Sequence, residues 1–293
     1  MRIARISTAD GPRHVVQDGD AWHGIADPFT GWAGDPFVGS AGGPTGGSPA
    51  TEPARTGESW PVAGATLLSP VVPTVVFGMA HNGGPADREL PPQAFQKSAR
   101  TVAGPGDAIG LDPSLGTVNV EGELAVVIGR TSRFLTADDV PGAILGYTIA
   151  NDVTAVDQIP SDHLLTQVKN GDAFTPIGPW IETEFDPSDA HILVRVGPAG
   201  SEDGDLPIVA DATTASLAWD VTEQLVYLTS FLTLGPGDIV LTGSPATFAP
   251  IVAGERAVIT IDGIGTLTNP TAVAGRPTVL VSAAPESSTG VTA

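Results

Sequence analysis

The chain has 293 residues, 41% of them hydrophobic and 16% charged, which is enough apolar material for one large globular domain with a small appendage. Its net charge of −20 argues against nucleic acid or an anionic membrane as a partner, because such partners need clustered Lys and Arg. The absence of cysteine excludes disulfides, a thiolate nucleophile and a Cys-ligated metal. No stretch approaches the ~20 apolar residues of a membrane span, and residues 1–10 lack the apolar core of a signal peptide, so we expect a cytoplasmic protein.

Residues 1–70 predict a small N-terminal β unit followed by a linker. Short alternating runs and Asp-Gly dipeptides in residues 1–27 favour antiparallel strands. Residues 28–64, which include GSAGGPTGGSPATEPARTG, are rich in Gly, Pro, Ser and Thr and too poor in apolar residues to pack. The main domain is expected over residues 71–281, and residues 282–293 are expected to be a disordered tail.

The main domain is predicted to be mostly β (α+β), with few helices. Strand-like runs separated by turn residues lie at 74–79, 123–129, 142–154, 178–183, 191–197, 237–244 and 255–270. This spacing favours a mostly-β architecture over alternating βα units. One helix is predicted over residues 213–234, beginning at threonines that can cap it and ending before Gly235.

Two carboxylates, Glu121 and Glu123, stand two positions apart in VNVEGELAVVIG, directly before an apolar run. Alternate residues of a strand point to the same face, so both acids project into the same space. Two like charges at such a short distance repel each other unless a cation lies between them. By itself, however, such a pair is typical of a solvent-exposed strand face.

A third carboxylate, Asp152, occurs in GYTIANDVTAVDQ, where it alternates with small residues that could line a cavity. Three acids from two strands can complete an all-oxygen site for a hard divalent cation. Mg²⁺ is the first expectation, with Mn²⁺ or Ca²⁺ as alternatives. Zinc fits less well, because the site offers no sulfur and no obvious histidine ligand.

Four motifs in order, VEGELAVVIGR, GYTIANDVTA, FTPIGPWIET and LGPGDIVLTGSP, resemble the fumarylacetoacetate hydrolase family over about residues 71–270. The resemblance implies a catalytic domain of rolled β-sheets behind a small N-terminal strand unit, usually assembled as a homodimer. It also implies Mg²⁺ or Mn²⁺ held by the three matching acids. Family members cleave or rearrange 2-oxo acids and β-dicarbonyl compounds, and a metal that chelates two oxygens of such a substrate stabilises the enolate as a Lewis acid.

The same resemblance supplies candidates for catalysis. Lys97 in FQKSART and Lys169 in TQVKNGDAFTPIGPW match family lysines expected near the substrate or metal oxygens. His81 and Glu89 lie in GMAHNGGPADRELPPQAF, which corresponds to the family's mobile lid, and are the candidates for activating water. His81 stands three positions earlier than the usual histidine, so the alternative is a histidine that only hydrogen-bonds within the loop.

Two departures from the family pattern fall where substrate would bind. Val156 in NDVTAVD replaces an arginine that would pair with an anionic group. The sequence GSPATFAP replaces a Gly-Thr-Pro-x-Gly turn, keeping a hydroxyl at Ser244 and placing Phe248 where small glycines are usual.

Three hypotheses follow from these residues. The first is a divalent-metal-dependent hydrolase that cleaves a C–C bond in a small acylpyruvate-like substrate, a 2-oxo acid or β-dicarbonyl compound. The second is a decarboxylase, isomerase or specialised biosynthetic lyase on the same scaffold, which Val156 and the imperfect lid favour. The third is a catalytically silent binding protein. The three carboxylates argue against it, because three converging acids cost stability without a cation.

Overall fold

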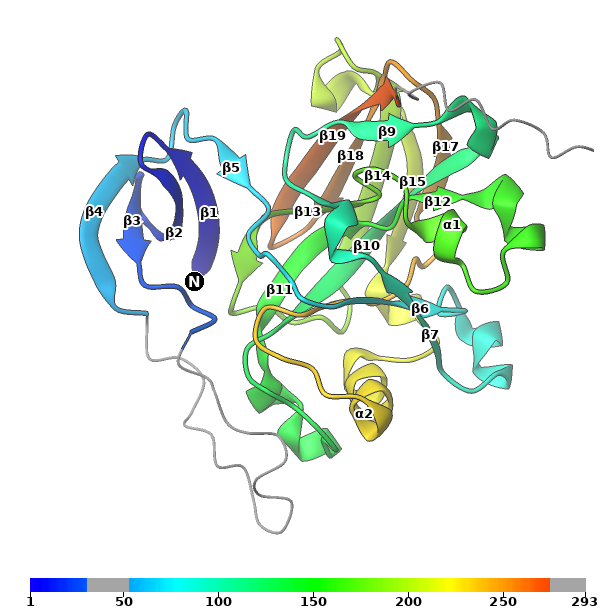
Figure 1. Ribbon diagram of the computed structural model, residues 1–293, viewed down its shortest axis with the longest axis horizontal. Coiled ribbons are helices and arrows are strands. Elements are labelled where there is room, and N and C mark those ends of the chain that lie inside the picture. The colour runs from blue at the N-terminus through cyan, green and yellow to red at the C-terminus, as the bar shows by residue number, and fades with distance from the viewer. Residues whose placement is uncertain (31–52, 275–293) are drawn as a thin grey trace, which may run out of the picture.

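The computed structural model describes residues 1–30 and 53–274, and its architecture is mostly β, as the sequence predicted. Figure 1 shows the N-terminal strands at one side of a larger body built from two layers of sheet. All seven predicted strand-like runs coincide with strands. Residues 31–52 of the expected linker and the expected tail at 282–293 lie outside the described residues.

Four antiparallel strands form the N-terminal unit: β1 (Arg2–Thr8), β2 (Gly11–Asp18), β3 (Ala21–Ile25) and β4 (Arg55–Pro61). β4 lies within the range expected to be linker, and it forms because it pairs with β3, which places Trp60 directly opposite Trp22. Trp22 is buried and lies near Trp180, with ring centroids 6.4 Å apart. β1 also pairs with β13 (Thr175–Glu182), so the N-terminal unit continues the sheet of the main body.

Within the described residues, the larger sheet follows the order β4-β3-β2-β1-β13-β11-β10-β16-β6-β7. Its strands in the main body are β6 (Val76–Ala80), β7 (Gln93–Lys97), β10 (Val118–Ile128), β11 (Ile144–Asn151), β13 and β16 (Ile239–Leu241). Four short strands join its sides: β5 (Leu67–Leu68), β8 (Val102–Ala103), β12 (Thr154–Ala155) and β17 (Phe248–Ile251). The smaller sheet contains, in spatial order, β15 (Ile208–Thr213), β14 (His191–Pro198), β18 (Glu255–Ile261), β19 (Gly265–Val273) and β9 (Ile109–Leu111).

β10 is the strand on which the two larger of the three hydrophobic cores in the described residues meet. Leu124 and Val126 belong to the core shared with the smaller sheet, whereas Ala125 and Val127 belong to the core on the opposite face. Gly122 faces the smaller sheet, and a Cβ there would lie 2.7 Å from Val194. A glycine between the two acids of β10 therefore lets the second sheet pack closely against the back of the strand.

The helix predicted over residues 213–234 was too long, because only α2 (Val221–Phe231) forms. Its N-cap is Asp220 rather than a threonine: Asp220 accepts a hydrogen bond from the Glu223 N–H at 2.8 Å, and Glu223 accepts one from the Asp220 N–H at 3.0 Å. The first threonine of the prediction, Thr213, ends β15 instead, since its backbone pairs with β14.

The other helical segments are short. They are α1 (Thr166–Lys169) and the 3₁₀ turns η1 (Pro85–Glu89), η2 (Ala99–Thr101), η3 (Pro113–Leu115), η4 (Ala137–Asp139), η5 (Pro141–Ala143), η6 (Val156–Ser161), η7 (Asp203–Asp205) and η8 (Thr214–Ser216). None of the helices in residues 1–30 and 53–274 has the length and apolar character needed to cross a bilayer.

Candidate metal centre

The three acids singled out in the sequence meet beside the junction of β10 and β11. Glu121 and Glu123 lie on β10, and Asp152 follows the last residue of β11. The pairing of these strands brings Asp152 beside Glu121, whose carbonyl oxygen accepts a hydrogen bond from the Asp152 N–H at 2.9 Å. One carboxylate oxygen from each acid lies within 4.8 Å of the others. The three side chains, called the triad below, therefore share one site.

The donor set of the triad fits a hard divalent cation. Mg²⁺, Mn²⁺ and Ca²⁺ prefer carboxylate oxygens, and ligands around such ions at about 2.1–2.5 Å stand roughly 3–5 Å from one another. The separations within the triad meet this requirement, and among the described residues no histidine joins the cluster. Glu123 and Asp152 are buried, so a cation held here would be shielded from bulk water. The triad can therefore bind a divalent metal ion.

Lys169, at the end of α1, offsets part of the charge of the triad. Its Nζ donates to Glu121 Oε2 at 3.2 Å and to Asp152 Oδ2 at 2.5 Å. It also donates to the Thr154 hydroxyl at 2.7 Å and lies 4.7 Å from the centre of the Phe95 ring. The predicted lysine therefore contacts two of the three acids from the β12 side of the site.

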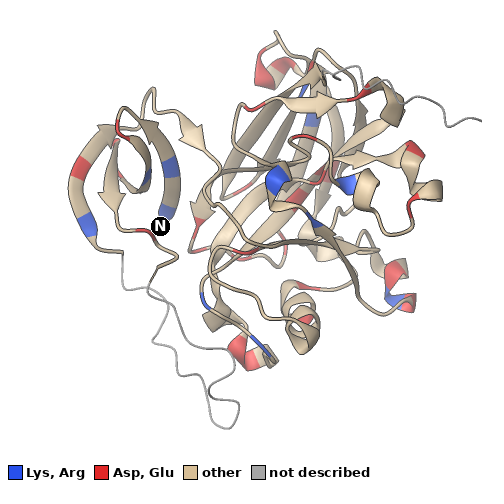
Figure 2. Ribbon diagram, viewed as in Figure 1, with Lys and Arg blue, Asp and Glu red and all other residues tan. Residues whose placement is uncertain are grey.

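Lys97, the last residue of β7, approaches the triad from within the protein. Its side chain is 0% exposed, and its Nζ donates to Asp152 Oδ1 and, at 2.8 Å, to the carbonyl oxygen of Phe174. Both lysines predicted from the sequence thus reach the acids. They are the only two lysines of the sequence, whereas the arginines drawn in Figure 2 are spread over the ribbon, from β1 and β4 of the N-terminal unit to the main body.

The pKa shifts of the three acids differ, and they distinguish the acid that has no ion-pair partner in the described part of the chain from the acid that has two. Burial raises the pKa of Glu123 well above its ordinary value, and the charges of Asp152 and Glu121 raise it further. Burial would also raise the pKa of Asp152, but the ammonium groups of Lys169 and Lys97 hold it below its usual range. Burial lowers the pKa of Lys97, against the opposing effect of Asp152. Among the described residues no lysine forms an ion pair with Glu123, and the charge of Lys169 only partly opposes the rise of its pKa, so the site can accept a further positive charge from a proton or a cation.

A backbone donor that sequence reasoning missed holds this third acid. The Gly243 N–H donates to Glu123 Oε2 at 2.7 Å. Gly243 has φ +102°, and a Cβ there would lie 2.7 Å from the carbonyl oxygen of Asn82, so the turn requires glycine. The predicted substrate-binding residue Ser244 shares a hydrogen bond of 2.9 Å with the Thr247 hydroxyl and so shapes the same turn.

His81 and Glu89, the candidates for activating water, lie on the loop between β6 and β7. Both side chains are exposed, and His81 has a left-handed backbone with φ +51°. In the part of the chain that the structure describes, no hydrogen bond or ion pair joins either residue to the triad. Their catalytic role stays a prediction.

Two further residues that sequence reasoning missed anchor this loop. Asn82 is buried, donates to the carbonyl oxygens of Thr242 at 2.7 Å and Trp219 at 3.0 Å, and accepts from the Trp219 N–H at 2.6 Å. Arg88 forms an ion pair with Glu223 at 2.7 Å and lies 4.4 Å from the Trp219 ring centre. The partners lie more than 130 residues away in the sequence, so no local pattern could have indicated them.

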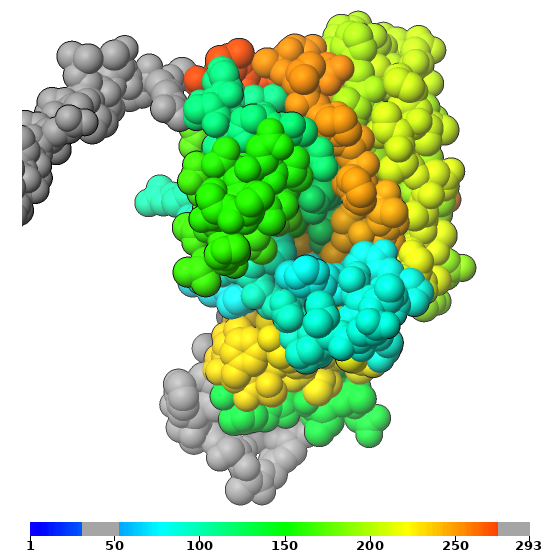
Figure 3. Space-filling model, turned by 90° about the vertical axis from the view of Figure 1, so that its right-hand side faces the viewer, coloured from blue at the N-terminus to red at the C-terminus, as the bar shows by residue number. Residues whose placement is uncertain are grey.

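Val156, the residue that replaces the family's arginine, is half-buried at the start of η6. Its N–H donates to the carbonyl oxygen of Thr117 at 3.0 Å, which continues the pairing of β12 with β10. Figure 3 shows a hollow on this side of the molecule, bordered by the segment around α1 and η6 in green, the loop after β6 in cyan and the segment around β17 in orange.

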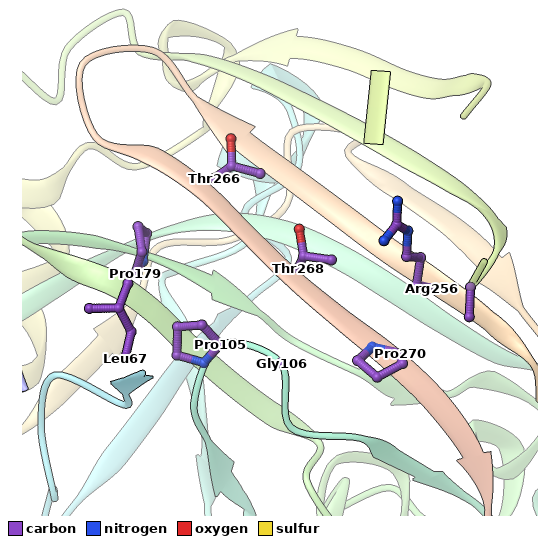
Figure 4. Close-up of a pocket in the computed structure, with 9 residues that line it drawn as sticks. Leu67, Pro105, Gly106, Pro179, Arg256, Thr266, Thr268 and Pro270 are labelled. Atoms are coloured by element: carbon purple, nitrogen blue, oxygen red, sulfur yellow. The ribbon is translucent and has the colours of Figure 1, made fainter. Parts of the chain in front are cut away.

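A second pocket lies away from the triad, between β5 and the smaller sheet (Figure 4). Its lining includes Leu67, Pro105, Pro179, Thr268 and Arg256. Arg256 is already paired with Asp203 at 2.6 Å. The lining residues include no acid, so this pocket is not the metal centre.

The fold and the triad together define a class, that of β-rich proteins with a buried acidic centre for a divalent cation. Residues 76–272 match the family described as fumarylacetoacetate (FAA) hydrolase, C-terminal, and residues 1–70 match one described as Rv2993c-like, N-terminal. The chain therefore belongs to the fumarylacetoacetate hydrolase family, as its motifs predicted.

Similar proteins span almost the whole chain. Protein Rv2993c of Mycobacterium tuberculosis is 37% identical over 290 residues, covering 94% of this chain and 100% of the relative. The structure of 2-hydroxyhepta-2,4-diene-1,7-dioate isomerase from Mycobacterium marinum has a TM-score of 0.79 and 36% identity, covering 94% of this chain and 100% of that one. The structure of maleylpyruvate hydrolase from Sphingobium sp. SYK-6, in complex with manganese(II) ion and pyruvate, has a TM-score of 0.70 and 25% identity over the same shares.

Proposed function

We propose that the chain is a divalent-metal-dependent enzyme that hydrolyses a C–C bond in a small 2-oxo acid or β-dicarbonyl substrate. The observation that carries the proposal is the buried triad with two lysines against it. The family membership and the pyruvate complex of the similar maleylpyruvate hydrolase support a 2-oxo acid as the substrate class. The homodimer and the cytoplasmic location stay predictions.

Mg²⁺ or Mn²⁺ is the proposed cofactor, held by Glu121, Glu123 and Asp152. When bound, such an ion supplies a Lewis acid for two neighbouring oxygens of the substrate. Three carboxylates offset by two lysines leave one negative charge in the site, so a dication brings the buried charge to +1. That positive balance favours an anionic substrate.

The two lysines are proposed to have different roles. Lys169 divides its three donors among Glu121, Asp152 and Thr154 at the edge of the site, so a substrate carboxylate can compete for them. Lys97 has no exposed surface and also donates to the main chain, so it is a positioning residue that holds Asp152 in its ionised form.

Hydrolysis further needs a base to activate water, and His81 with Glu89 remains the proposed source. Asn82, one anchor of their loop, connects it through the Thr242 carbonyl oxygen to the turn of Gly243, which itself holds Glu123, whereas Arg88 connects the loop to Glu223 of α2. A movement of this loop would therefore shift the turn of Gly243 and, with it, the Glu123 carboxylate.

Isomerisation or decarboxylation on the same scaffold is the second candidate. Two observations favour it: His81 and Glu89 are exposed, and the apolar Val156 occupies the position of an arginine. The name of the similar Mycobacterium marinum isomerase points the same way. A silent binding protein is less well supported, because a buried triad is costly to keep without a cation.

The reactions differ in their products, which NMR spectroscopy separates. Metal-free protein loaded with Mg²⁺ would be mixed, in separate samples, with a 2,4-dioxo acid, with oxaloacetate and with an unsaturated 2-hydroxy diacid. Hydrolysis consumes one water and yields pyruvate plus a carboxylic acid, decarboxylation yields CO₂, and isomerisation leaves the molecular mass unchanged. We expect the wild type to form pyruvate and a carboxylic acid from the 2,4-dioxo acid, and Glu123→Ala to form neither. Turnover of these compounds only to isomers or CO₂ would replace hydrolysis with the second candidate.

A further inference from the structure

Phe248 places an aromatic ring beside the triad. It is the first residue of β17, and in the antiparallel pairing with β10 it lies directly opposite Glu121. Residues opposite each other in such a pair point to the same face, with their Cβ atoms about 4.5–5.5 Å apart. The ring therefore stands on the same face of the sheet as the Glu121 carboxylate.

The two sides of the site differ in polarity across β10. On one side β12 pairs with β10, with Thr154 opposite Asn119, and the Thr154 hydroxyl accepts a hydrogen bond from Lys169 at 2.7 Å. β17 pairs with the other side of β10 and brings Phe248. The lysine therefore approaches Glu121 from one side and the phenyl ring from the other, which gives the site a charged side and an apolar side.

Phe248 is not a core residue. Its side chain is 53% exposed, whereas Ala249 and Ile251 of the same strand are buried in the core between the sheets. β17 is thus attached to the protein by its alternate residues, and the ring is available to a ligand. Single exposed aromatic residues are common on protein surfaces, and this ring is distinguished from them by its position next to the triad.

We propose that Phe248 is a specificity-determining residue that binds an aromatic or bulky apolar group on the acyl end of the substrate. The carboxylate end then lies towards the triad and Lys169. This inference rests on the proposed function and narrows it to a substrate class, 2,4-dioxo acids whose C4 carbonyl carries an aryl or branched alkyl group.

Binding of two inert chelators to the Mn²⁺-loaded protein, measured by calorimetry, tests this inference without turnover. Oxamate and N-phenyloxamate carry the same charge and the same pair of chelating oxygens, and they differ only by a phenyl ring. We expect the wild type to bind N-phenyloxamate more tightly than oxamate. Phe248→Ala should weaken N-phenyloxamate by roughly tenfold and oxamate by less than about twofold, because only the apolar contact is lost. Phe248→Leu should recover part of the affinity.

Phe231, at the end of α2, provides a matched control because its side chain is also 53% exposed. Phe231→Ala should leave both affinities unchanged, and all variants should bind Mn²⁺ as the wild type does. Equal affinity of the wild type for the two chelators, or an equal effect of Phe248→Ala on both, would overturn the inference and leave the proposed function standing. If neither chelator binds the Mn²⁺-loaded wild type, the proposed function fails and the inference fails with it.

Discussion

In the triad, the side chains are placed by strand register and buried among charges, whereas the loop of residues 81–90 is held by a few polar contacts and exposes His81 and Glu89. Glu121 and Glu123 follow from their alternation along β10, and the pairing with β11 adds Asp152. The loop instead depends on Asn82 and on the exposed ion pair of Arg88. A change in the triad should therefore cost the protein more free energy of unfolding than a change in the loop.

Breaking one ion pair in each region tests this difference. In the metal-free protein, Lys169→Met leaves Glu121 without its ion-pair partner and Asp152 with Lys97 alone, so the free energy of unfolding should fall by about 3–5 kcal/mol. Arg88→Met breaks an exposed pair and a cation–π contact and should cost no more than about 2 kcal/mol. Denaturant unfolding measures both, and Mn²⁺ should return part of the loss only in the Lys169 variant. Equal losses in the two variants would remove the distinction between the regions.

The loop should matter for rate rather than for metal affinity. If His81 is the base, His81→Asn should lower kcat by on the order of 100-fold, because a positioned proton acceptor is lost. Mn²⁺ affinity, measured by calorimetry, should stay at the wild-type value because His81 lies outside the triad. A variant that keeps the full rate would assign the base elsewhere, with Glu89 the next residue to change.

Val156 sharpens the comparison on the substrate side of the site. Arginine at this position offers a charge-assisted pair to a second carboxylate, so Val156→Arg should shift relative kcat/KM towards oxaloacetate and away from an acylpyruvate by roughly tenfold or more. Competition assays with the two substrates measure the ratio directly. If the wild type already prefers oxaloacetate, or if the variant leaves the ratio of the two kcat/KM values unchanged, Val156 does not form an apolar contact surface for the substrate.

The smallest effect is expected outside both regions, at His191 on β14 of the smaller sheet. Hydrogen bonds to Asp211 at 2.7 Å and Asp262 at 3.3 Å raise the pKa of His191. Its contribution to stability is therefore fully present below about pH 6.5, the pKa of histidine in an unfolded chain, and is lost as pH rises through the folded pKa. Because the pair is exposed, His191→Asn should lower the free energy of unfolding by only a few tenths of a kcal/mol at pH 5.5 and by less at pH 9. Thermal unfolding at the two pH values measures the difference, and a larger loss at pH 9 would contradict the sign.

The sequence predicted best those features of the structure that depend on the local order of residues. Alternation along a strand is a local property, so seven strand-containing runs of the main body and the common face of Glu121 and Glu123 could be predicted, whereas β9 and β15 were missed. The helix start could not be placed from the threonines, although the capping box of Asp220 and Glu223 was present in the sequence. β4 was missed because its stability comes from pairing with β3 rather than from its own composition.

The polar supports of the site were beyond reach for a different reason. Gly243 and Asn82 are ordinary turn residues in the sequence, and their importance comes from Glu123 and Thr242, to which distant parts of the chain bring them. Phe248 was singled out in the sequence as a departure from the family pattern, but its position opposite Glu121 depends on the register of β17. Register between distant strands is a tertiary property, and one sequence by itself does not encode it visibly.

Calorimetric titration with Mn²⁺ tests most directly whether the triad is a metal centre. The wild type should bind one ion per chain, and Glu123→Ala should lose detectable binding while its circular dichroism spectrum stays unchanged. Glu89→Ala, which removes an exposed carboxylate on the loop, is the matched control and should bind as the wild type does. Unchanged Mn²⁺ affinity in Glu123→Ala would contradict the assignment of the site.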